Sequence, residues 1–165
     1  TEADVYEAQL QGTVEVLFPD GHRARFNVHQ HNGRPWKRGA SRASQPRYWY
    51  FRAVDDVLGW GEPDGCEACG KIVLKPNVAV AGDVWNLGPG RLIWVEATDG
   101  PRLVVLADSG GAFAANLFQL DWYGGAFSSP DALYAATKAI PGRVRAGFLV
   151  AKPLAVPEVV APSER

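Results

Sequence analysis

The chain has 165 residues with a formal net charge of −1 at pH 7, and 47% of the residues are hydrophobic. This length fits a single compact domain with a real core. A charge so close to zero argues against nucleic acid or an anionic membrane surface as the main partner. No apolar run approaches the ~20 residues that cross a bilayer, so no membrane span is expected. The 18 glycines and 12 prolines predict many turns and short strands, as in all-β folds.

A hairpin and a basic loop are predicted for residues 1–47. Alternating apolar and polar residues over 13–18 and 22–28 flank the turn signal Pro19-Asp20-Gly21. Five basic side chains follow between glycine, serine and proline residues: Arg34, Lys37, Arg38, Arg42 and Arg47. We interpret this stretch as a solvated polar loop, with binding of an anionic glycan as the alternative.

Short strands and one helix are predicted for the rest of the chain. The strands are expected at 48–54, 72–74, 78–80, 91–97, 101–107, 117–121 and 143–151. Residues 98–100 form the turn of a second hairpin. The helix begins after the N-cap Ser129, has Pro130 and Asp131 in its first turn, and runs to about Ala139. Residues 153–165 are expected to form a flexible tail.

The two cysteines, Cys66 and Cys69, form a C-x-x-C pair. Such a pair can be a disulfide, half of a zinc site or a redox motif, and a redox motif needs a βαβ context that the sequence lacks. Zinc needs about four ligands, of which His29 and His31 could supply two from one face of a strand. We favour a disulfide or free thiols, and predict no metal and no cofactor.

Two aspartates, Asp108 and Asp121, are candidates for chemistry. They lie on either side of the Gly110-Gly111 turn, and each is next to an apolar run. Cleavage of a glycosidic bond needs a carboxyl group that can hold or give a proton, and a second polar group that sets its environment. Aspartate is also a common turn residue, so the spacing alone leaves both interpretations open.

The surrounding motifs carry a resemblance to a known family. Asp108-Ser-Gly-Gly-Ala-Phe, followed by Gln119-Leu-Asp121-Trp-Tyr, resembles the Asp-Thr-Gly-Gly-Ala-Ile and Arg-Ile-Asp-x-Phe signature of the three-aspartate (3D) domain of the membrane-bound lytic transglycosylase A family. Upstream, Asp83-Val-Trp-Asn-Leu-Gly-Pro-Gly-Arg-Leu-Ile-Trp-Val-Glu is similar to the segment around another of the family's aspartates. The chain has Ser109, Gln119 and Val84 where the family has threonine, arginine and proline. The resemblance covers roughly residues 50–151.

This resemblance implies a mainly β fold, a six-stranded double-psi β-barrel with one short helix and an N-terminal hairpin and loop extension. The domains would be residues 1–47, packed on a barrel of residues 48–152, and a tail. It also implies a secreted or periplasmic, cell-envelope protein. The sequence begins at Thr1 and contains no methionine, so we interpret it as a processed or trimmed product without a visible signal segment.

The implied function is that of a lytic transglycosylase, which cleaves peptidoglycan and leaves 1,6-anhydro-sugar ends. By motif position, Asp121 would be the general acid and base, Asp108 would stabilise charge on the sugar, and Asp83 would be a further polar group of the cleft. The residues expected to bind substrate are Ser109, Gly110, Gly111, Trp85 and Tyr123. Trp122 is expected to face the core or a rim, and Trp94 to pack in the core.

Two other functions remain open on the sequence. An expansin-like barrel would bind cell-wall glycan without cleaving it, and an inverting endoglucanase would hydrolyse a β-glucan with two carboxyl groups ~6.5–9.5 Å apart. All three functions imply a polysaccharide partner. The sequence predicts neither the particular glycan nor the oligomeric state.

Overall fold

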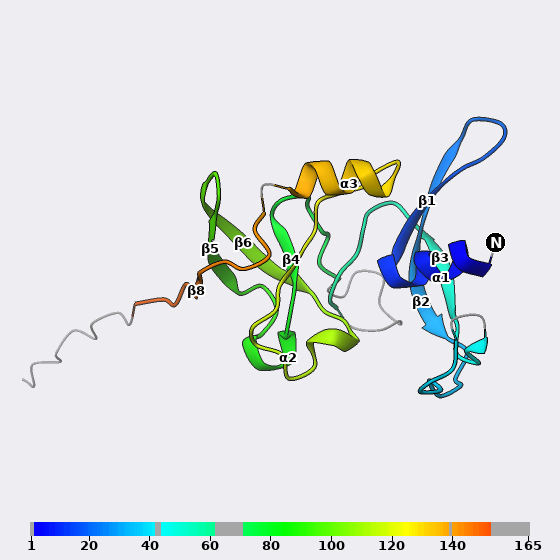
Figure 1. Ribbon diagram of the computed structural model, residues 1–165, viewed down its shortest axis with the longest axis horizontal. Helices are drawn as coiled ribbons and strands as arrows, with labels where there is room; N and C mark the ends of the chain where they lie inside the picture. Colours follow the sequence, from blue (N-terminus) through cyan, green and yellow to red (C-terminus); the bar gives the residue numbers. More distant parts are fainter. Residues whose placement is uncertain (1, 42–43, 62–70, 139, 153–165) are drawn as a thin grey trace, which may run out of the picture.

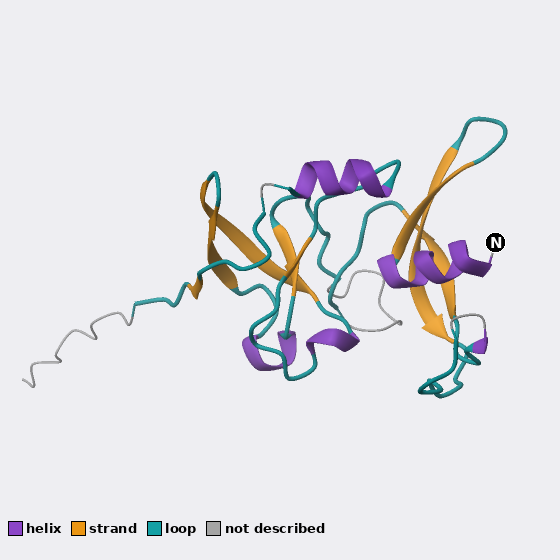
Figure 2. Cartoon of the chain, viewed as in Figure 1, coloured by secondary structure: helices purple, strands orange, loops and turns teal. Residues whose placement is uncertain are grey.

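The computed structural model describes residues 2–41, 44–61, 71–138 and 140–152. The predictions on Cys66, Cys69, Arg42 and the tail lie outside the described residues. Strands form two sheets that lie side by side along the molecule, one of three strands and one of five (Figure 1). Helices are few, and the sheets and their loops make up most of the described chain (Figure 2). No helix in the described ranges is long and apolar enough to cross a membrane.

The N-terminal sheet contains the predicted hairpin. Helix α1 (Glu2–Gln11) leads into β1 (Thr13–Leu17), β2 (Arg23–His31) and β3 (Trp49–Val54), which pair antiparallel in the order β1-β2-β3. The turn between β1 and β2 holds Gly21 at a φ of 87°, a left-handed conformation that glycine adopts without strain. Strand β3 pairs with β2, so this sheet extends beyond the predicted boundary at residue 47.

The larger sheet has the order β7-β4-β6-β5-β8. Its elements are β4 (Ala79–Ala81), α2 (Val84–Leu87), β5 (Leu92–Ala97), β6 (Gly100–Asp108), β7 (Asp121–Trp122), α3 (Pro130–Thr137) and β8 (Ala146–Phe148). Strands β4 and β6 are parallel and the other pairs are antiparallel. The predicted hairpin of residues 91–107 is confirmed as β5 and β6, and Ser129 caps α3 as expected.

The core surrounds β4 and β6, the central strands of this sheet. On one face Val80, Val104 and Leu106 pack with residues of β5 and α2. On the other face Ala79 and Ala107 pack with Leu74. A strand that is covered on both faces is apolar at successive positions, which explains the run from Val104 to Ala107, whereas Leu103 before it is exposed. Strand β5 instead alternates exposed and buried residues.

Several predicted elements differ in the structure. Residues 72–74 contribute only an isolated bridge between Val73 and Leu58, β7 contains two residues of the predicted 117–121, and β8 contains three of 143–151. Helices α1 and α2 were not predicted. These short elements have too few residues to show a period. The described strands form open sheets with no closed barrel among them, so the six-stranded barrel stays a prediction.

Candidate active site

Strand β4 brings the two candidate aspartates into one row. Ala81 is the register partner of Asp108 on β6, after a register irregularity that skips Ala107, and on its other side of Asp121 on β7. Neighbouring strands are about 4.8 Å apart, so the two aspartate backbones are roughly 9.5 Å apart across Ala81. Asp108 and Asp121, which are 13 positions apart in sequence, thus lie on either side of Ala81.

The alternation of side chains shows which face this row occupies. Val80 and its register partner Trp122 pack on the face that carries Leu106. Because successive strand residues point to opposite faces, Ala81 and Asp121 are on the opposite face, with Ala79. Tyr123 packs against that second cluster. Trp122, which was expected to face the core or a rim, is partly buried and packs against the core cluster.

Asp108 is the partly buried carboxyl group of the row. Burial raises its pKa from 3.8 to about 6, and this outweighs the lowering by a hydrogen bond from the Ser109 backbone and by the Lys71 charge. Gly59 lies directly against it: a Cβ at Gly59 would be 2.4 Å from the Ala107 carbonyl oxygen and 3.1 Å from the Asp108 Cβ. The glycine therefore lets the 57–60 segment cover the end of β6 closely.

Asp121 is exposed and is oriented by its own loop. Gln119 Nε2 donates a hydrogen bond to Asp121 Oδ1 at 3.2 Å, and Asn116 Nδ2 donates to Gln119 Oε1 at 2.9 Å. Gln119 stands where the family has arginine, so the position retains a donor without its charge. The sequence identified Gln119 only as a departure from the motif and did not identify Asn116 at all.

Asp83 is the N-cap residue of helix α2. Its side chain is fully buried and caps α2, since Oδ1 accepts from the Asn86 backbone at 3.1 Å and Oδ2 accepts from Asn86 Nδ2 at 2.7 Å. A carboxylate at a helix N-terminus satisfies amides that have no partner within the helix. This capping role accounts for an aspartate here without any contact with substrate.

The Ser109-Gly110-Gly111 turn follows Asp108 directly. Ser109 Oγ donates to the Gly82 carbonyl at 2.8 Å, which ties the end of β6 to the segment after β4. A 3-10 turn over Gly111–Phe113 then buries the Phe113 ring. A Cβ at Gly110 or Gly111 would meet no atom closer than 3.7 Å, so the turn is open to an approaching ligand.

The aromatic residues divide between the two sides of the sheet. Tyr123 is on the face of the aspartate row, and burial raises the pKa of its phenol. Trp85 is exposed on α2 and makes an edge-to-face contact with Trp60, which the sequence did not identify. Trp94 is exposed, so the prediction that it packs in the core was wrong. Its neighbours Ile93 and Val95 point inward instead, because β5 alternates.

The N-terminal sheet contacts the 57–60 segment, which covers Asp108, through a polar side chain. Asn27 is buried, accepts from Thr13 Oγ1 at 2.7 Å and donates to the Leu58 carbonyl at 3.3 Å. The Arg25 charge acts on the Tyr123 phenol and lowers its pKa, opposing the effect of burial. The Lys71 charge acts in the same direction on the Asp108 carboxyl group. In the described residues, no three or more His, Cys, Asp or Glu side chains gather as a metal site.

Comparison with known proteins gives matches in structure alone. No protein-family model matches the chain, and no curated protein matches it in sequence. MltA from Escherichia coli with bound chitohexaose is similar with a TM-score of 0.61 and 20% identity, over 90% of this chain and 54% of that one. The membrane-bound lytic murein transglycosylase from Agrobacterium tumefaciens has a TM-score of 0.61 and 20% identity, over 90% and 49%. MltA from Neisseria gonorrhoeae has a TM-score of 0.55 and 17% identity, over 88% and 41%.

The chain therefore has the fold of MltA-type lytic transglycosylases, as its aspartate motifs predicted. Those solved structures are enzymes that act on murein, and one of them holds a chitin oligosaccharide. At 20% identity or less, the likeness shows the fold alone. The chain spans about half the length of these structures, so activity and substrate are matters for a proposal.

Proposed function

We propose that this chain carries the active site of a peptidoglycan-cleaving lytic transglycosylase. The observation that carries the proposal is the row of Asp108, Ala81 and Asp121, in a chain with the fold of MltA-type enzymes. The glycan bound to the E. coli neighbour supports a polysaccharide substrate. A cell-envelope location follows from this substrate. The six-stranded double-psi barrel implied by the resemblance belongs to the same proposal.

In the proposed reaction Asp121 transfers the proton. Its carboxyl group protonates the leaving glycosidic oxygen as the bond to C1 breaks. The resulting carboxylate then takes the proton of the sugar's own 6-hydroxyl, whose oxygen bonds to C1 and closes the 1,6-anhydro ring. One residue serves both steps because the second returns its proton. The Gln119 hydrogen bond restrains the Asp121 carboxyl group.

Asp108 is proposed to stabilise positive charge on the sugar ring. Its pKa of about 6 makes it an anion at neutral pH and a neutral acid below about pH 5. We expect kcat/KM to fall as the pH decreases through about 6, since this ratio reports the groups of the free enzyme. Asp108→Asn should have a lower kcat/KM and lack this acidic limb.

The test compares Asp121→Asn with Asn116→Asp on purified peptidoglycan, with fragments identified by mass spectrometry. Losing a general acid and base reduces the rate ~10²–10⁴-fold, whereas the melting temperature of Asp121→Asn should stay near that of the parent because the side chains are nearly isosteric. Asn116→Asp introduces a charge two steps along the same hydrogen-bond chain and should retain most turnover. Anhydro-sugar ends in the products identify a transglycosylase, and reducing ends identify a hydrolase.

Full turnover in Asp121→Asn would assign the proton transfer to another residue. Asp108 is then the candidate, because its raised pKa is a specific observation in its favour. A parent that releases no fragments from any peptidoglycan or β-glucan, yet binds them, would establish a binding module of the expansin kind.

A further inference from the structure

A hollow with a different chemistry lies on the N-terminal sheet. It has a volume of about 460 Å³ and is lined by Glu15, Arg23, Ala24, Arg25, Ala53, Val54 and Asp55. The two alanines contribute little side-chain bulk, so the charged residues define its character. None of these residues belongs to the motifs that suggested the enzyme family.

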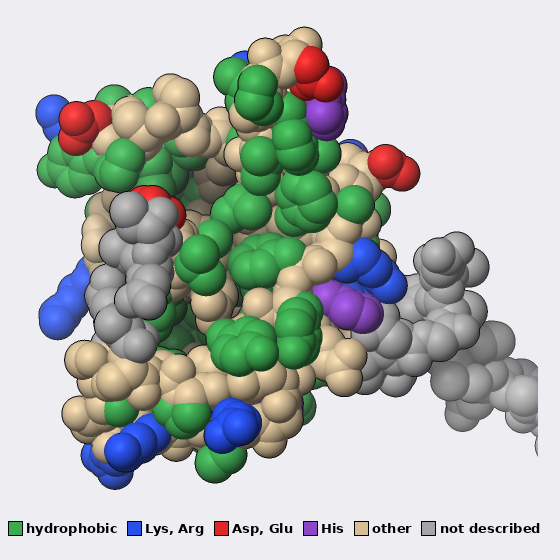
Figure 3. All heavy atoms as spheres, turned by 90° about the vertical axis from the view of Figure 1, so that its right-hand side faces the viewer, with side chains coloured by type: hydrophobic (Ala, Val, Ile, Leu, Met, Phe, Trp, Pro, Cys, Tyr) green, Lys and Arg blue, Asp and Glu red, His purple; other side chains and the backbone are tan. Residues whose placement is uncertain are grey.

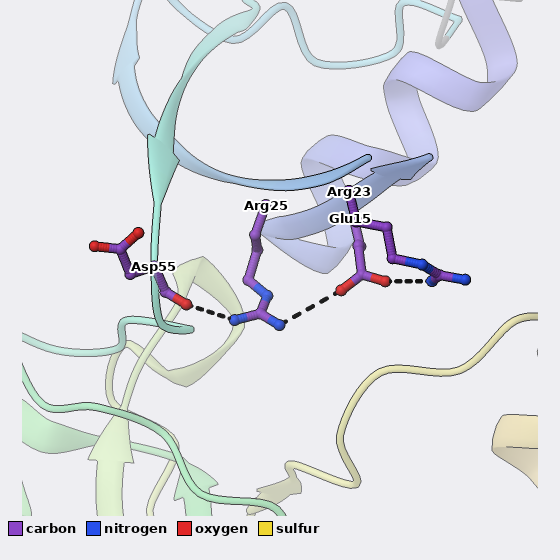
Figure 4. Close-up of polar contacts among 4 residues, drawn as sticks. All are labelled: Glu15, Arg23, Arg25 and Asp55. Carbon is purple, nitrogen blue, oxygen red and sulfur yellow. Dashed lines mark hydrogen bonds and ion pairs between the residues drawn. The ribbon is translucent and has the colours of Figure 1, made fainter. Parts of the chain in front are cut away.

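Two arginines in this hollow share one carboxylate. Arg23 Nη1 donates to Glu15 Oε1 at 2.7 Å, and Arg25 Nη2 donates to Glu15 Oε2 at 3.4 Å (Figure 4). The hydrogen bond from Arg23 is the largest influence on Glu15 and lowers the pKa of its carboxyl group. Two guanidinium groups against the one Glu15 carboxylate leave a formal charge of +1 on these three residues, and Asp55 balances it across the lining as a whole.

The arginine closest to the large sheet is held in place before any ligand binds. Arg25 Nη1 donates to the Asp55 backbone oxygen at 2.7 Å, while the Asp55 carboxylate points away from the guanidinium (Figure 4). The Arg25 side chain is 31% exposed, against 64% for Arg23. A guanidinium has five N–H donors in a rigid plane, and the bonds to Glu15 and Asp55 engage only part of this set. A fixed, partly exposed arginine loses little side-chain entropy on binding.

A short chain of contacts joins the sheet that carries the hollow to the proposed active site. Asn27 Nδ2 donates to the Leu58 carbonyl at 3.3 Å, and the next residue, Gly59, lies against Asp108, since a Cβ there would be 3.1 Å from the Asp108 Cβ. Register places Glu15 opposite Arg25, two residues along from the pair of Thr13 and Asn27 and therefore on the same face of the sheet. A ligand that crosses the aspartate row can therefore extend into the hollow.

We propose that Arg25 and Arg23 bind a carboxylate on a peptide stem of the peptidoglycan strand that is being cleaved. This inference rests on the proposed function, because it takes the glycan to lie over the aspartate row. Peptidoglycan differs from chitin in carrying peptides with free carboxylates along its sugar chain. Guanidinium groups bind carboxylates by paired, charge-assisted hydrogen bonds. The site would thus select peptide-bearing glycan over the neutral sugar chain.

The experiment measures binding by calorimetry with two soluble probes. One is a glycan oligomer that bears peptide stems, and the other is chitohexaose, which has no carboxylate. For Arg25→Gln we expect binding of the peptide-bearing oligomer to weaken ~10-fold, as charge-assisted hydrogen bonds are lost, while binding of chitohexaose changes less than about 2-fold. Arg23→Gln should show the same selectivity with a smaller loss, because Arg23 is more exposed.

Arg145→Gln is the matched control, since it removes the same charge beside β8, at the far edge of the large sheet, where Arg145 is 3.8 Å from Glu96. It should leave the affinity for both probes unchanged. The preference of the parent for the peptide-bearing probe should also decrease as salt is added, because salt screens exposed charges.

Equal weakening for both probes, or no weakening for either, overturns the proposal. If the parent cleaves peptidoglycan but Arg25→Gln binds both probes as the parent does, the subsite proposal fails and the proposed function stands. If the parent cleaves nothing but Arg25→Gln weakens binding of the peptide-bearing probe, the proposed function fails and the subsite proposal stands. If Arg25→Gln does not fold, the proposal is tested by whether Arg23→Gln weakens binding of the peptide-bearing oligomer and spares binding of chitohexaose.

Discussion

The two sheets differ in how much core each one has. In the described part of the chain, every buried hydrophobic side chain belongs to the 74–113 region, on or beside the five-stranded sheet. The three-stranded sheet contributes one buried residue, and it is the polar Asn27. A small antiparallel sheet with one helix has too few residues to bury both of its faces. The carboxyl row stands on the well-packed sheet, whereas the proposed anion site stands on the sparsely packed one.

Both regions leave large hydrophobic side chains exposed. In the N-terminal unit these are Val5, Leu10, Val16, Leu17, Trp36, Tyr48 and Tyr50. Figure 3, which views the molecule from this side, shows hydrophobic side chains gathered across the face. A group that must transfer a proton needs fixed geometry, which a dense core supplies. A group that binds a long, variable polymer tolerates a looser support.

Truncation of the large core should have the largest effect on stability. Leu106 is fully buried on central strand β6, and Leu106→Ala should reduce the free energy of unfolding by about 2–5 kcal/mol. Phe26→Ala, on a half-buried ring in β2, should reduce it by clearly less. Urea unfolding of both variants measures the difference. Equal losses would show that the two sheets share one cooperative core.

The charge state of Asp108 should set how stability depends on pH. Its pKa is about 6 in the folded protein and 3.8 as the ordinary value. The folded state therefore binds the proton more tightly than the unfolded state does. The contribution of Asp108 to the stability of the protein is fully present below about pH 4 and is lost as the pH rises through 6. The loss is on the order of 3 kcal/mol.

Asp108→Asn should remove this dependence and stabilise the protein at pH 7, since the amide oxygen can still accept from Ser109. Melting temperatures at several pH values between 4 and 8 provide the measurement. A variant that is less stable than the parent at pH 7 would contradict the buried, destabilised anion.

Asn27→Ala tests the link between the two sheets. The change leaves the Thr13 hydroxyl and the Leu58 carbonyl without the side chain that pairs with them, at a cost of about 1–3 kcal/mol. Gln30→Ala, at an exposed position of the same strand, is the control and should change stability by less than about 0.5 kcal/mol. Hydrogen exchange should locate the loss in β2 and the 57–60 segment. Faster exchange confined to the five-stranded sheet would contradict this role.

Ser109→Ala should have the smallest effect. It removes the hydrogen bond to the Gly82 carbonyl, which contributes about 0.5–1.5 kcal/mol. The exposed Ser128→Ala is the control. If Ser109 instead contacts substrate, as its motif position predicts, turnover will decrease by far more than stability does. Parallel measurement of the melting temperature and kcat/KM separates the two roles.

The motifs predicted the fold and the aspartate row better than the surroundings of that row. Asp108 and Asp121 were identified by motif, and the register then placed both beside Ala81. The Gln119 and Asn116 hydrogen bonds, the Trp60 contact and the approach of Arg25 were not predicted. Each joins a residue to a loop or to another sheet, and no period or local motif encodes such a contact.

The sequence by itself determined the local elements. The turns at 19–21 and 98–100 and the cap at Ser129 depend on a few adjacent residues, and the structure has the two hairpins and α3 where those residues predict them. Tertiary structure alone decided that β3 pairs with β2, that Trp94 faces solvent and that Asp83 is a buried cap. It also decided that burial raises the pKa of Asp108. These outcomes depend on long-range strand pairing and on desolvation, which arise only when distant segments meet.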